Sequence, residues 1–167
     1  MAADPAAPRT AVLTVSEAAA AGRRIDESGP ALEAAAARLL GAAPAQRLVL
    51  PDDAGEISRQ LLAWCDEGID LILLTGGTGV SPRDRTPEAV RIVLDIEIPG
   101  MAEKMRADTG RKLPAAYLSR QIVGARGRTL IMALPGSPRG AVDCFEAVAS
   151  LIPHALAVLA GGRVPHP

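Results

Sequence analysis

Aromatic residues are nearly missing from this chain. Its 167 residues include one tryptophan, one tyrosine and one phenylalanine, which together make up 2% of the sequence. The core must therefore be aliphatic, and apolar residues do make up 49% of the chain. The scarcity of aromatic residues argues against a surface that stacks single-stranded bases, because such surfaces rely on aromatic rings.

A strong net charge is also missing. The formal net charge is −1, so a general electrostatic attraction to nucleic acid is not expected. Basic residues nevertheless gather in the second half of the chain. They form either a solvated basic face or a surface that attracts an anionic substrate. They are Arg106, Arg111, Lys112, Arg120, Arg126, Arg128 and Arg139.

Cysteines and long apolar runs are scarce. Cys65 and Cys144 lie far apart and fit no metal-ligand spacing, so each is predicted to be a buried thiol. Residues 1–10 lack the apolar segment of a signal peptide. The apolar run 155–160 is shorter than the roughly 18–20 residues that span a bilayer. We therefore expect a cytoplasmic protein that binds no membrane.

What the chain does contain is an alternation of short apolar runs with helical segments. The run 69–75 is apolar almost without interruption, which is typical of a strand covered by helices on both sheet faces. Strands are predicted over residues 11–15, 47–50, 69–75 and 129–134. The alternation predicts an α/β fold, in which a doubly wound, mostly parallel sheet carries helices on both faces.

The domain is expected to span residues 9–160, between loose tails at 1–8 and 161–167. Local motifs mark its helix ends. Asp53-Ala-Gly-Glu56 has the spacing of an acidic capping box. Thr86-Pro87 predicts a cap and a first-turn proline for the next helix, and Pro99-Gly100 predicts the end of that helix. Residues 115–119 are predicted to be either a short strand or irregular.

The most informative segment leads from the predicted strand at 69–75 into a glycine-rich loop at 76–79. Glycine lets backbone N–H groups approach an anion closely, because no Cβ stands in the way. The loop also carries Arg83 and Asp84, and a carboxylate is a ligand that Mg²⁺ prefers. It is neither a Walker loop nor a dinucleotide fingerprint, because neither spacing is present. The composition is that of a loop able to hold a phosphate and a metal side by side.

Two further segments are expected beside this loop. In parallel α/β sheets, ligands bind outside the carboxyl ends of the strands. The strand at 47–50 leads to Asp52, and the strand at 129–134 leads to the turn at 135–138. Asp53 fits the cap of the following helix by its spacing, which leaves Asp52 free to face a ligand.

Each of these features also has a purely structural interpretation. A glycine cluster after a strand is often a tight turn, and Asp52 or Asp84 could cap a helix. Ser119 beside Arg120 is, from the residues alone, a hydroxyl beside a charge. The combination of glycines, Arg83 and Asp84 on one short loop favours the ligand site.

The segment from Thr75 to Ala89, Thr-Gly-Gly-Thr-Gly-Val-Ser-Pro-Arg-Asp-Arg-Thr-Pro-Glu-Ala, resembles the signature of the MoaB/Mog family of molybdenum cofactor biosynthesis proteins. That family includes molybdopterin adenylyltransferases and the gephyrin G domain. The similarity covers residues 10–160 and continues in further motifs. These are Ser28-Gly-Pro30, Leu50-Pro-Asp52, Trp64-Cys-Asp66, Ile98-Pro-Gly100, Leu118-Ser-Arg120, Gly124-Ala-Arg-Gly127 and Leu134-Pro-Gly136.

This resemblance implies a fold, an assembly and a reaction. The implied fold is doubly wound α/β, and the implied assembly is a homotrimer. The implied reaction transfers AMP from Mg²⁺-ATP to the terminal phosphate of molybdopterin and releases pyrophosphate. The implied ligands are therefore ATP with Mg²⁺ and molybdopterin as substrate, with no nucleic acid.

The family motifs also imply roles for single residues. Asp52 and Asp84 match essential carboxylates that would hold Mg²⁺, and Ser119 matches the serine of a Leu-Ser-Arg element; these three are the candidate catalytic residues. The candidate phosphate-binding residues are Gly76, Gly77, Thr78, Gly79 and Arg83. The candidate substrate-binding residues are Ser16, Arg120, Pro135 and Gly136.

One motif departs from the family. The family often has Ser-Asp-Arg after the first strand, and this chain has Ser16-Glu17-Ala18, which keeps the negative charge and loses the arginine. Two alternatives to the adenylyltransferase therefore stay open: a non-catalytic molybdopterin-binding or scaffold protein of the same fold, and an unrelated nucleotide-binding module. The presence of Asp52, Asp84 and Ser119 together favours the enzyme, because a scaffold has no use for metal-binding carboxylates.

Overall fold

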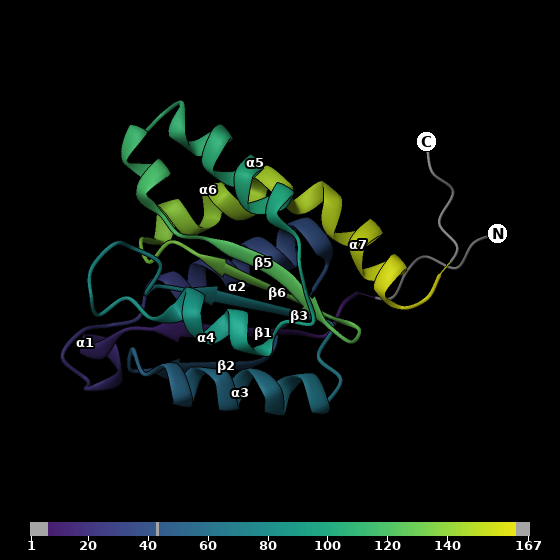
Figure 1. The fold of residues 1–167 in the computed structure, drawn as a ribbon, viewed down its shortest axis with the longest axis horizontal. Coiled ribbons are helices and arrows are strands. Elements are labelled where there is room, and N and C mark those ends of the chain that lie inside the picture. Colours follow the sequence, from purple (N-terminus) through teal and green to yellow (C-terminus); the bar gives the residue numbers. More distant parts are fainter. Residues whose placement is uncertain (1–6, 43, 163–167) are drawn as a thin grey trace.

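A computed structural model describes residues 7–42 and 44–162, and it contains a six-stranded sheet with the strand order β2-β1-β3-β6-β5-β4 (Figure 1). Four neighbouring strands are parallel, and the last two join them antiparallel. The parallel strands are β1 (Thr10–Val15), β2 (Pro44–Leu50), β3 (Leu71–Thr75) and β6 (Thr129–Leu134). The other two strands are β5 (Ile122–Arg126), which pairs antiparallel with β6, and β4 (Ile96–Glu97), which pairs antiparallel with β5. The prediction of a mostly parallel, doubly wound sheet is confirmed.

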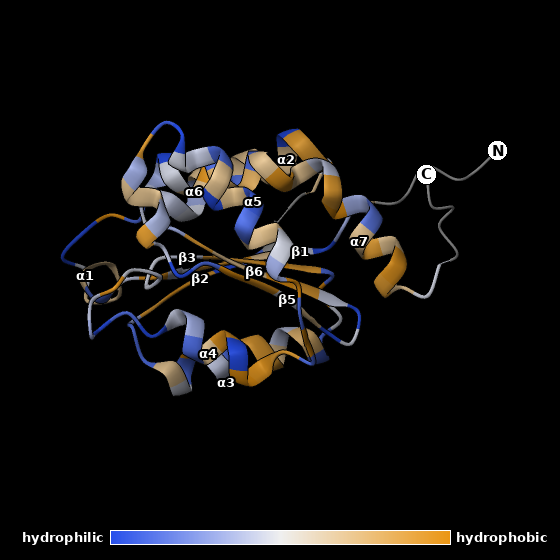
Figure 2. Cartoon of the chain, turned by 45° about the horizontal axis from the view of Figure 1, so that its top comes forward, coloured by the Kyte–Doolittle hydropathy of each residue, from blue (hydrophilic) through white to orange (hydrophobic). Residues whose placement is uncertain are grey.

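Helices cover both faces of this sheet (Figures 1 and 2). One face carries α3 (Ala54–Asp66) and α4 (Thr86–Val93). The other carries α2 (Ser28–Leu40), α5 (Pro99–Gly110) and α6 (Pro138–Val148). The remaining short elements are α1 (Glu17–Ala20), two 3₁₀ turns, η1 (Pro114–Leu118) and η2 (Ala149–Leu151), and the final helix α7 (Ile152–Leu159).

Two apolar clusters form the core, one on each face of the sheet. Successive side chains of a strand point to opposite faces, so a strand covered on both sides must be apolar throughout. In β3, Leu71 and Leu73 pack into the cluster with α2, α5 and α6, whereas Ile72 and Leu74 pack into the cluster with α3 and α4. Figure 2 shows the central strands as continuously apolar.

The helix-end predictions were partly right. The capping box is confirmed in its first half, because the Asp53 carboxylate accepts a hydrogen bond from the Glu56 N–H at 2.8 Å. The cap assigned to Thr86 is wrong: α4 begins at Thr86, Arg85 occupies the cap position, and no side chain caps the helix. Pro99-Gly100 starts α5 rather than ending α4, which stops at Val93 before the short strand β4.

Residues 115–119, predicted to be a short strand or irregular, form no strand: most of them belong to the 3₁₀ turn η1, and the strand β5 follows. Gly124 lies in β5 opposite Glu97 of β4, and a Cβ on it would meet the Ile96 carbonyl oxygen at 2.4 Å. The glycine that weakens the strand signal in the sequence is therefore required by a close backbone approach.

Three other expectations can be compared with the structure. Cys144 is buried as predicted, whereas Cys65 is only half-buried. Residues 138–159, which form α6, η2 and α7, are long and apolar enough to cross a bilayer by length and composition, although the sequence suggested no such run. Four residues of α6 in this stretch, Ala141, Cys144, Phe145 and Val148, lie in the core. Most of both predicted tails, residues 1–6 and 163–167, lies outside the described residues.

Candidate functional site at the carboxyl ends of the strands

Three loops that follow parallel strands meet at one edge of the sheet. The Gly76 N–H donates to the Leu134 carbonyl at 3.2 Å, and the Thr75 hydroxyl donates to the Pro135 carbonyl at 2.7 Å. At the end of β1, the Ser16 N–H donates to the Leu50 carbonyl at 2.9 Å. The expected convergence of the Asp52, glycine-loop and Pro135 segments is therefore present.

The glycine loop depends on two residues with a left-handed backbone. Gly76 has a φ of 99° and Gly77 a φ of 64°. A Cβ on Gly76 would lie 2.2 Å from the Val15 carbonyl oxygen, which is backbone and cannot swing aside. Both glycines are therefore required by conformation and by close packing.

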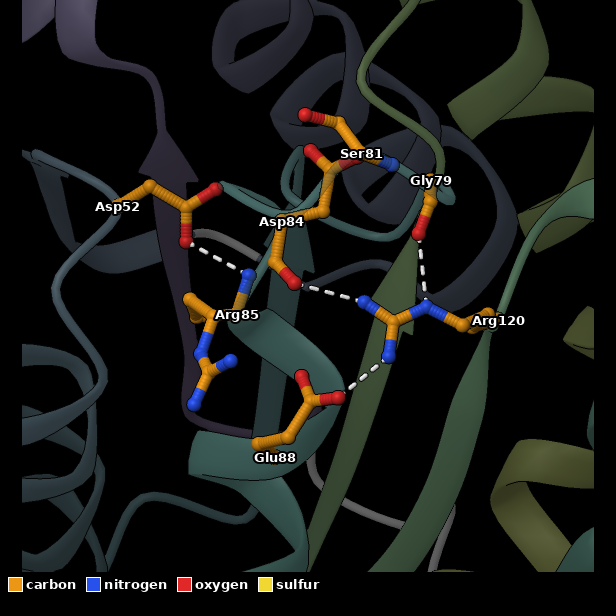
Figure 3. Close-up of polar contacts among 7 residues, drawn as sticks. All are labelled: Asp52, Gly79, Ser81, Asp84, Arg85, Glu88 and Arg120. Atoms are coloured by element: carbon orange, nitrogen blue, oxygen red, sulfur yellow. Dashed lines mark hydrogen bonds and ion pairs between the residues drawn. The ribbon is translucent and has the colours of Figure 1, made fainter.

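The two candidate carboxylates, Asp52 and Asp84, lie near each other, with Asp84 between Asp52 and Gly79 of this loop in the view of Figure 3. Asp52 accepts a hydrogen bond from the Arg85 N–H at 2.9 Å, and Asp84 accepts one from the Ser81 N–H at 2.9 Å. A Cβ on Gly77 would lie 2.8 Å from a carboxylate oxygen of Asp52. A Cβ on Gly79 would lie 2.7 Å from a carboxylate oxygen of Asp84. Acidic groups from two separate crossovers therefore converge beside the loop.

Negative charge is concentrated around Asp52. Partial burial raises the pKa of its carboxyl, and the neighbouring carboxylates of Asp84, Glu17 and Glu88 raise the pKa further, while the hydrogen bond from the Arg85 N–H works against them. A carboxyl whose pKa is raised in this way gains from a nearby cation, because the cation offsets the burial and the repulsion.

The donor set around Asp52 and Asp84 fits Mg²⁺. This ion is commonly bound through one or two carboxylates, with waters and substrate phosphates completing its shell. Thr86 adds a hydroxyl oxygen that is buried, lacks a hydrogen-bond partner and lies 2.3 Å from the position of a Cβ on Gly77. Within residues 7–42 and 44–162, no three histidine, cysteine or acidic side chains form a group that could hold a metal ion.

A first hollow of about 360 Å³ opens beside Gly76 and Gly77. Two helices start at its wall: α2 begins at Ser28, and α6 follows Ser137, whose hydroxyl accepts a hydrogen bond from the Gly140 N–H. The positive dipole end of a helix favours an anion, although at these two starts the Gly29 N–H is bound by Asp26 and the Gly140 N–H by Ser137. The first hollow therefore has the character of a phosphate site.

A second hollow of about 480 Å³ lies on the other side of the turn at 135–138. Ser119 lines it, and the Ser119 hydroxyl lies 3.2 Å from the hydroxyl of Thr78 in the glycine loop. Ser137 lines both hollows, so the two spaces meet at this turn. Two ligands could approach each other there.

A third hollow of about 310 Å³ lies on the outer side of the loop, beside Asp84, Arg85, Glu88 and Arg120. A larger hollow of about 560 Å³ contains none of the candidate residues. It lies near Ile69 and Thr129, at the amino ends of β3 and β6, far from the loops described above.

Several candidate residues make protein contacts that the sequence did not predict. The Ser16 hydroxyl caps α1 by accepting from the Ala19 N–H at 3.2 Å, and Ser16 also lines the first hollow. Arg83 is exposed on the loop, and its N–H donates to the Ser81 hydroxyl at 3.3 Å. Arg120 donates from its guanidinium to the loop itself. Pro135 lines the second hollow, and Gly136 lines the first.

Sequence reasoning missed four residues of the site. Asp26 and Ser28 line the first hollow, and Asp26 accepts hydrogen bonds from the Thr14 hydroxyl at 2.8 Å and the Gly29 N–H at 3.0 Å. Glu17 accepts from the Asp52 N–H at 3.2 Å. Ser137 was included only as part of a turn, although a serine before a proline at a helix start is a usual cap signal.

Comparison with known proteins gives consistent matches. The model of a family described as "Probable molybdopterin binding domain" matches residues 11–154. Molybdopterin adenylyltransferase of Helicobacter pylori is 38% identical over 90% of this chain and 86% of its own length. The crystal structure of the molybdopterin biosynthesis enzyme MoaB from Thermus thermophilus has 48% identity and a TM-score of 0.86, covering 92% of this chain and 97% of that one.

Longer relatives match over part of their length. The molybdenum cofactor synthesis protein cinnamon of Drosophila melanogaster is 38% identical over 87% of this chain, which corresponds to 24% of cinnamon. The chain thus spans nearly all of the bacterial relatives above and about a quarter of cinnamon.

Proposed function

Because the chain belongs to the MoaB/Mog family of molybdopterin-binding domains, we propose that it transfers AMP from Mg²⁺-ATP to molybdopterin, giving adenylyl-molybdopterin and pyrophosphate. The observation that carries this proposal is the convergence of Asp52 and Asp84 beside the glycine loop. A domain that only binds a pterin has no need for two carboxylates facing a phosphate loop.

The proposed reaction joins two phosphates. An oxygen of the terminal phosphate of molybdopterin attacks the α-phosphorus of ATP and forms the new P–O bond. The bond from the α-phosphorus to the oxygen that bridges to the β-phosphorus breaks, and that oxygen leaves with pyrophosphate. The attacking oxygen is already anionic at neutral pH, so no protein base is required. The demand on the protein is to hold like charges together and to neutralise them.

The first hollow suits the phosphates of ATP. The backbone of Gly77 and the starts of α2 and α6 border it, and these groups favour anions without needing a lysine. The Gly76 N–H is already used, because it donates to the Leu134 carbonyl. Arg24 is exposed at the same hollow and adds a cation. These contacts support the assignment of the nucleotide to this side of the turn.

The second hollow suits molybdopterin. Its lining combines apolar side chains such as Leu113 with the hydroxyl of Ser119 and the cation of Lys112. Arg139 also lines it and pairs with Asp143 at 3.8 Å. A heterocycle that carries a phosphate needs this combination. Because Ser137 borders both hollows, a phosphate from each side could meet at the turn.

Asp52 and Asp84 would hold Mg²⁺, directly or through water, beside the triphosphate. When bound there, the ion supplies positive charge that offsets the charge developing on the transferred group. Asp53 is occupied as the cap of α3, which leaves the Asp52 carboxylate to face the loop.

The proposal is tested by incubating the purified protein with molybdopterin, ATP and Mg²⁺ and measuring adenylyl-molybdopterin and pyrophosphate. We expect both products in equal amounts and neither after chelation of Mg²⁺. A homologue of known activity serves as the positive control. If that homologue forms product and this protein forms none, the adenylyltransferase assignment is wrong.

A second candidate function is a non-catalytic molybdopterin-binding or scaffold role. The departure at Ser16-Glu17-Ala18 favours it, because the arginine that the family often has at this point is missing, and with it a cation that would contact an anionic substrate. The same assay separates the two functions. A scaffold binds molybdopterin in an equilibrium titration and yields no pyrophosphate.

We also propose that the protein acts as a homotrimer in the cytoplasm, where ATP and Mg²⁺ are available. Large apolar side chains are exposed on and beside η1, namely Leu113, Tyr117 and Leu118, at 62%, 60% and 61% of their surface. Such neighbouring exposed apolar groups are typical of a surface that another chain covers. Light scattering coupled to size exclusion should give three times the monomer mass of 17.2 kDa.

A further inference from the structure

Arg120 connects two ends of the loop that carries Asp84 (Figure 3). Its Nε donates to the Gly79 carbonyl at 2.7 Å, and its Nη2 donates to the Asp84 carbonyl at 2.6 Å. Its Nη1 pairs with the Glu88 carboxylate on the first turn of α4. The Arg120 backbone N–H also donates to the Thr78 carbonyl at 2.7 Å. One residue thus holds the loop at its start, at its end and at the helix that follows.

Two further hydrogen bonds hold the end of this loop, from the Arg85 N–H to the Asp52 carboxylate and from the Thr86 N–H to the Gly77 carbonyl, and the exposed part of the loop before Asp84 has no other outside contact of this kind among the described residues. Its residues 80–83 are exposed, with 67% of the Val80 surface open to solvent, so apolar packing does not fix their positions. Its internal hydrogen bonds involve only Ser81 with Arg83 and Asp84. A segment with few buried contacts opens locally at low free-energy cost unless hydrogen bonds from outside restrain it.

The charge of Arg120 is already balanced within the protein. Burial works to raise the pKa of Glu88, but the hydrogen bond and charge of Arg120 outweigh it, so the pKa of the Glu88 carboxyl lies below its ordinary value. Both partners are therefore ionised at neutral pH, and the pair has no net charge. A guanidinium neutralised in this way adds little to the binding of an anionic substrate, whereas its planar fork suits several fixed acceptors at once.

We infer that Arg120 and Glu88 form a clamp that positions the glycine loop and Asp84, so that Arg120 acts as a positioning residue rather than as a contact to the substrate. Calling the clamped loop a Mg²⁺-ATP site rests on the proposed function. The clamp itself rests only on the contacts above.

The clamp also connects the two sides of the site. Arg120 directly follows Ser119, whose hydroxyl lies at the second hollow and 3.2 Å from Thr78. Arg106 of α5 donates to the carbonyls of Ser119 and Gln121, at 3.5 and 3.2 Å, and so fixes this segment to the helical layer. The loop with Asp84 is therefore anchored, through Arg120, to a rigid part of the fold.

The test compares Arg120→Lys, Arg120→Ala and Glu88→Gln with the wild-type protein and with Arg91→Ala. Arg91 lies on the same helix as Glu88 and forms an exposed ion pair with Glu97 at 3.6 Å, so it is a matched control outside the site. Two quantities are measured: amide hydrogen exchange over residues 77–86 in the free protein, and the Kd for a non-hydrolysable ATP analogue with Mg²⁺ by calorimetry.

In both arginine variants we expect exchange over residues 77–86 to accelerate at least about tenfold and the Kd to rise about tenfold, which corresponds to loss of roughly one charge-assisted hydrogen bond. Lysine keeps the charge but cannot make the forked contacts, so it should not rescue. Glu88→Gln, which keeps an acceptor oxygen, should change both quantities in the same direction by a smaller factor. Arg91→Ala should change neither.

Three results would overturn the clamp. A raised Kd with unchanged exchange in the free protein would make Arg120 a direct ligand contact. Faster exchange with an unchanged Kd would make its role purely structural. Wild-type behaviour of Arg120→Lys would mean that charge alone matters. If the wild-type protein fails to bind the nucleotide analogue, the proposed function fails, while the exchange measurement still decides whether Arg120 holds the loop.

Discussion

The Asp52 carboxylate accepts a hydrogen bond from the backbone N–H of Arg85 at 2.9 Å. This contact joins the loop after β2 to the loop after β3, two segments that are separated by the whole of α3. Because Arg85 directly follows Asp84, the same bond fixes where the second carboxylate begins. A hydrogen bond between a side chain and the backbone therefore positions the two carboxylates of the proposed metal site without a bound metal.

This contact predicts the behaviour of Asp52→Asn. Asparagine keeps an oxygen that accepts from Arg85, but it cannot carry charge, so adenylyl transfer should fall at least about 100-fold. Stability should not fall. The pKa of Asp52 is higher in the folded protein than in the unfolded chain. Between these two pKa values the folded protein binds more protons, so its stability falls as the pH rises and Asp52 ionises.

Urea unfolding of the wild type and of Asp52→Asn measures which of the two proteins is more stable. At neutral pH the variant should be equal to or more stable than the wild type, by up to about 1 kcal/mol. The difference should vanish when the pH falls below the ordinary aspartate pKa of about 3.9, where the carboxyl is protonated in both states. A variant that is much less stable at neutral pH would show that the ionised carboxylate stabilises the fold.

Glu17 is predicted to contribute to the acid limit of activity. Burial is the main cause of the raised pKa of Asp52, the charge of Glu17 raises this pKa further, and the Glu17 carboxylate accepts from the Asp52 N–H at 3.2 Å. In Glu17→Gln the amide oxygen can keep this hydrogen bond while the charge is lost. The pKa of Asp52 should fall, and the acid limb of the pH profile of kcat/KM should move to lower pH.

The matched control for this shift is Glu33→Gln, which removes a carboxylate on α2 that pairs with Arg47 at 3.5 Å, outside the site. Its pH profile should coincide with that of the wild type. A shift of the Glu17→Gln profile to higher pH would contradict the electrostatic explanation.

Asp84→Asn should separate catalysis from folding. The Asn oxygen can still accept from the Ser81 N–H, which Asp84 does now at 2.9 Å, so the loop should keep its shape. Turnover should be abolished because a ligand charge for Mg²⁺ is lost, while the oligomer and the melting curve stay nearly unchanged. Differential scanning calorimetry with the product assay checks both. Loss of folding would assign Asp84 a structural role.

Asp53→Ala provides the opposite pattern. Asp53 caps α3 by accepting from the Glu56 N–H at 2.8 Å, so its removal should cost about 1 kcal/mol of stability. For a domain of this size the melting temperature should fall by about 2–4 °C. Turnover below that temperature should stay normal. Lost activity in Asp53→Ala would mean that the two adjacent aspartates share the site.

The sequence predicted the sheet well where burial alone decides the structure. The run at 129–134 forms a strand with those limits because both of its faces are covered. The convergence of Asp52 and Asp84 could also be predicted, since both follow parallel strands and the carboxyl ends of such strands share one edge.

Other features depend on contacts between distant segments and were not predictable. Thr86 has the residue type of a helix cap, yet its N–H donates to the Gly77 carbonyl, and α4 starts at Thr86 itself. Gly124 lowers the strand signal of β5, and only its pairing with β4 and β6 explains the strand. The acceptors of Arg120 lie 32 to 41 residues away in the chain, so no local pattern indicates them.

Gly77→Ala should damage both the fold and the site, whereas Gly22→Ala should affect only stability. Both glycines have a positive φ, 64° and 70°, so alanine is strained at each by about 1–2 kcal/mol. A Cβ on Gly22 meets nothing within 4 Å, so backbone strain is the whole cost of Gly22→Ala.

A Cβ on Gly77 would lie 2.3 Å from the Thr86 hydroxyl and 2.8 Å from the Asp52 carboxylate. Thr86 is fully buried and cannot turn away, so the new methyl must displace Asp52 or the loop. We therefore expect Gly77→Ala to lose about 2–4 kcal/mol by urea unfolding and most of its affinity for Mg²⁺-ATP. Equal loss of stability in the two variants, with full nucleotide binding in Gly77→Ala, would show that the loop accommodates a methyl group at residue 77 without moving Asp52.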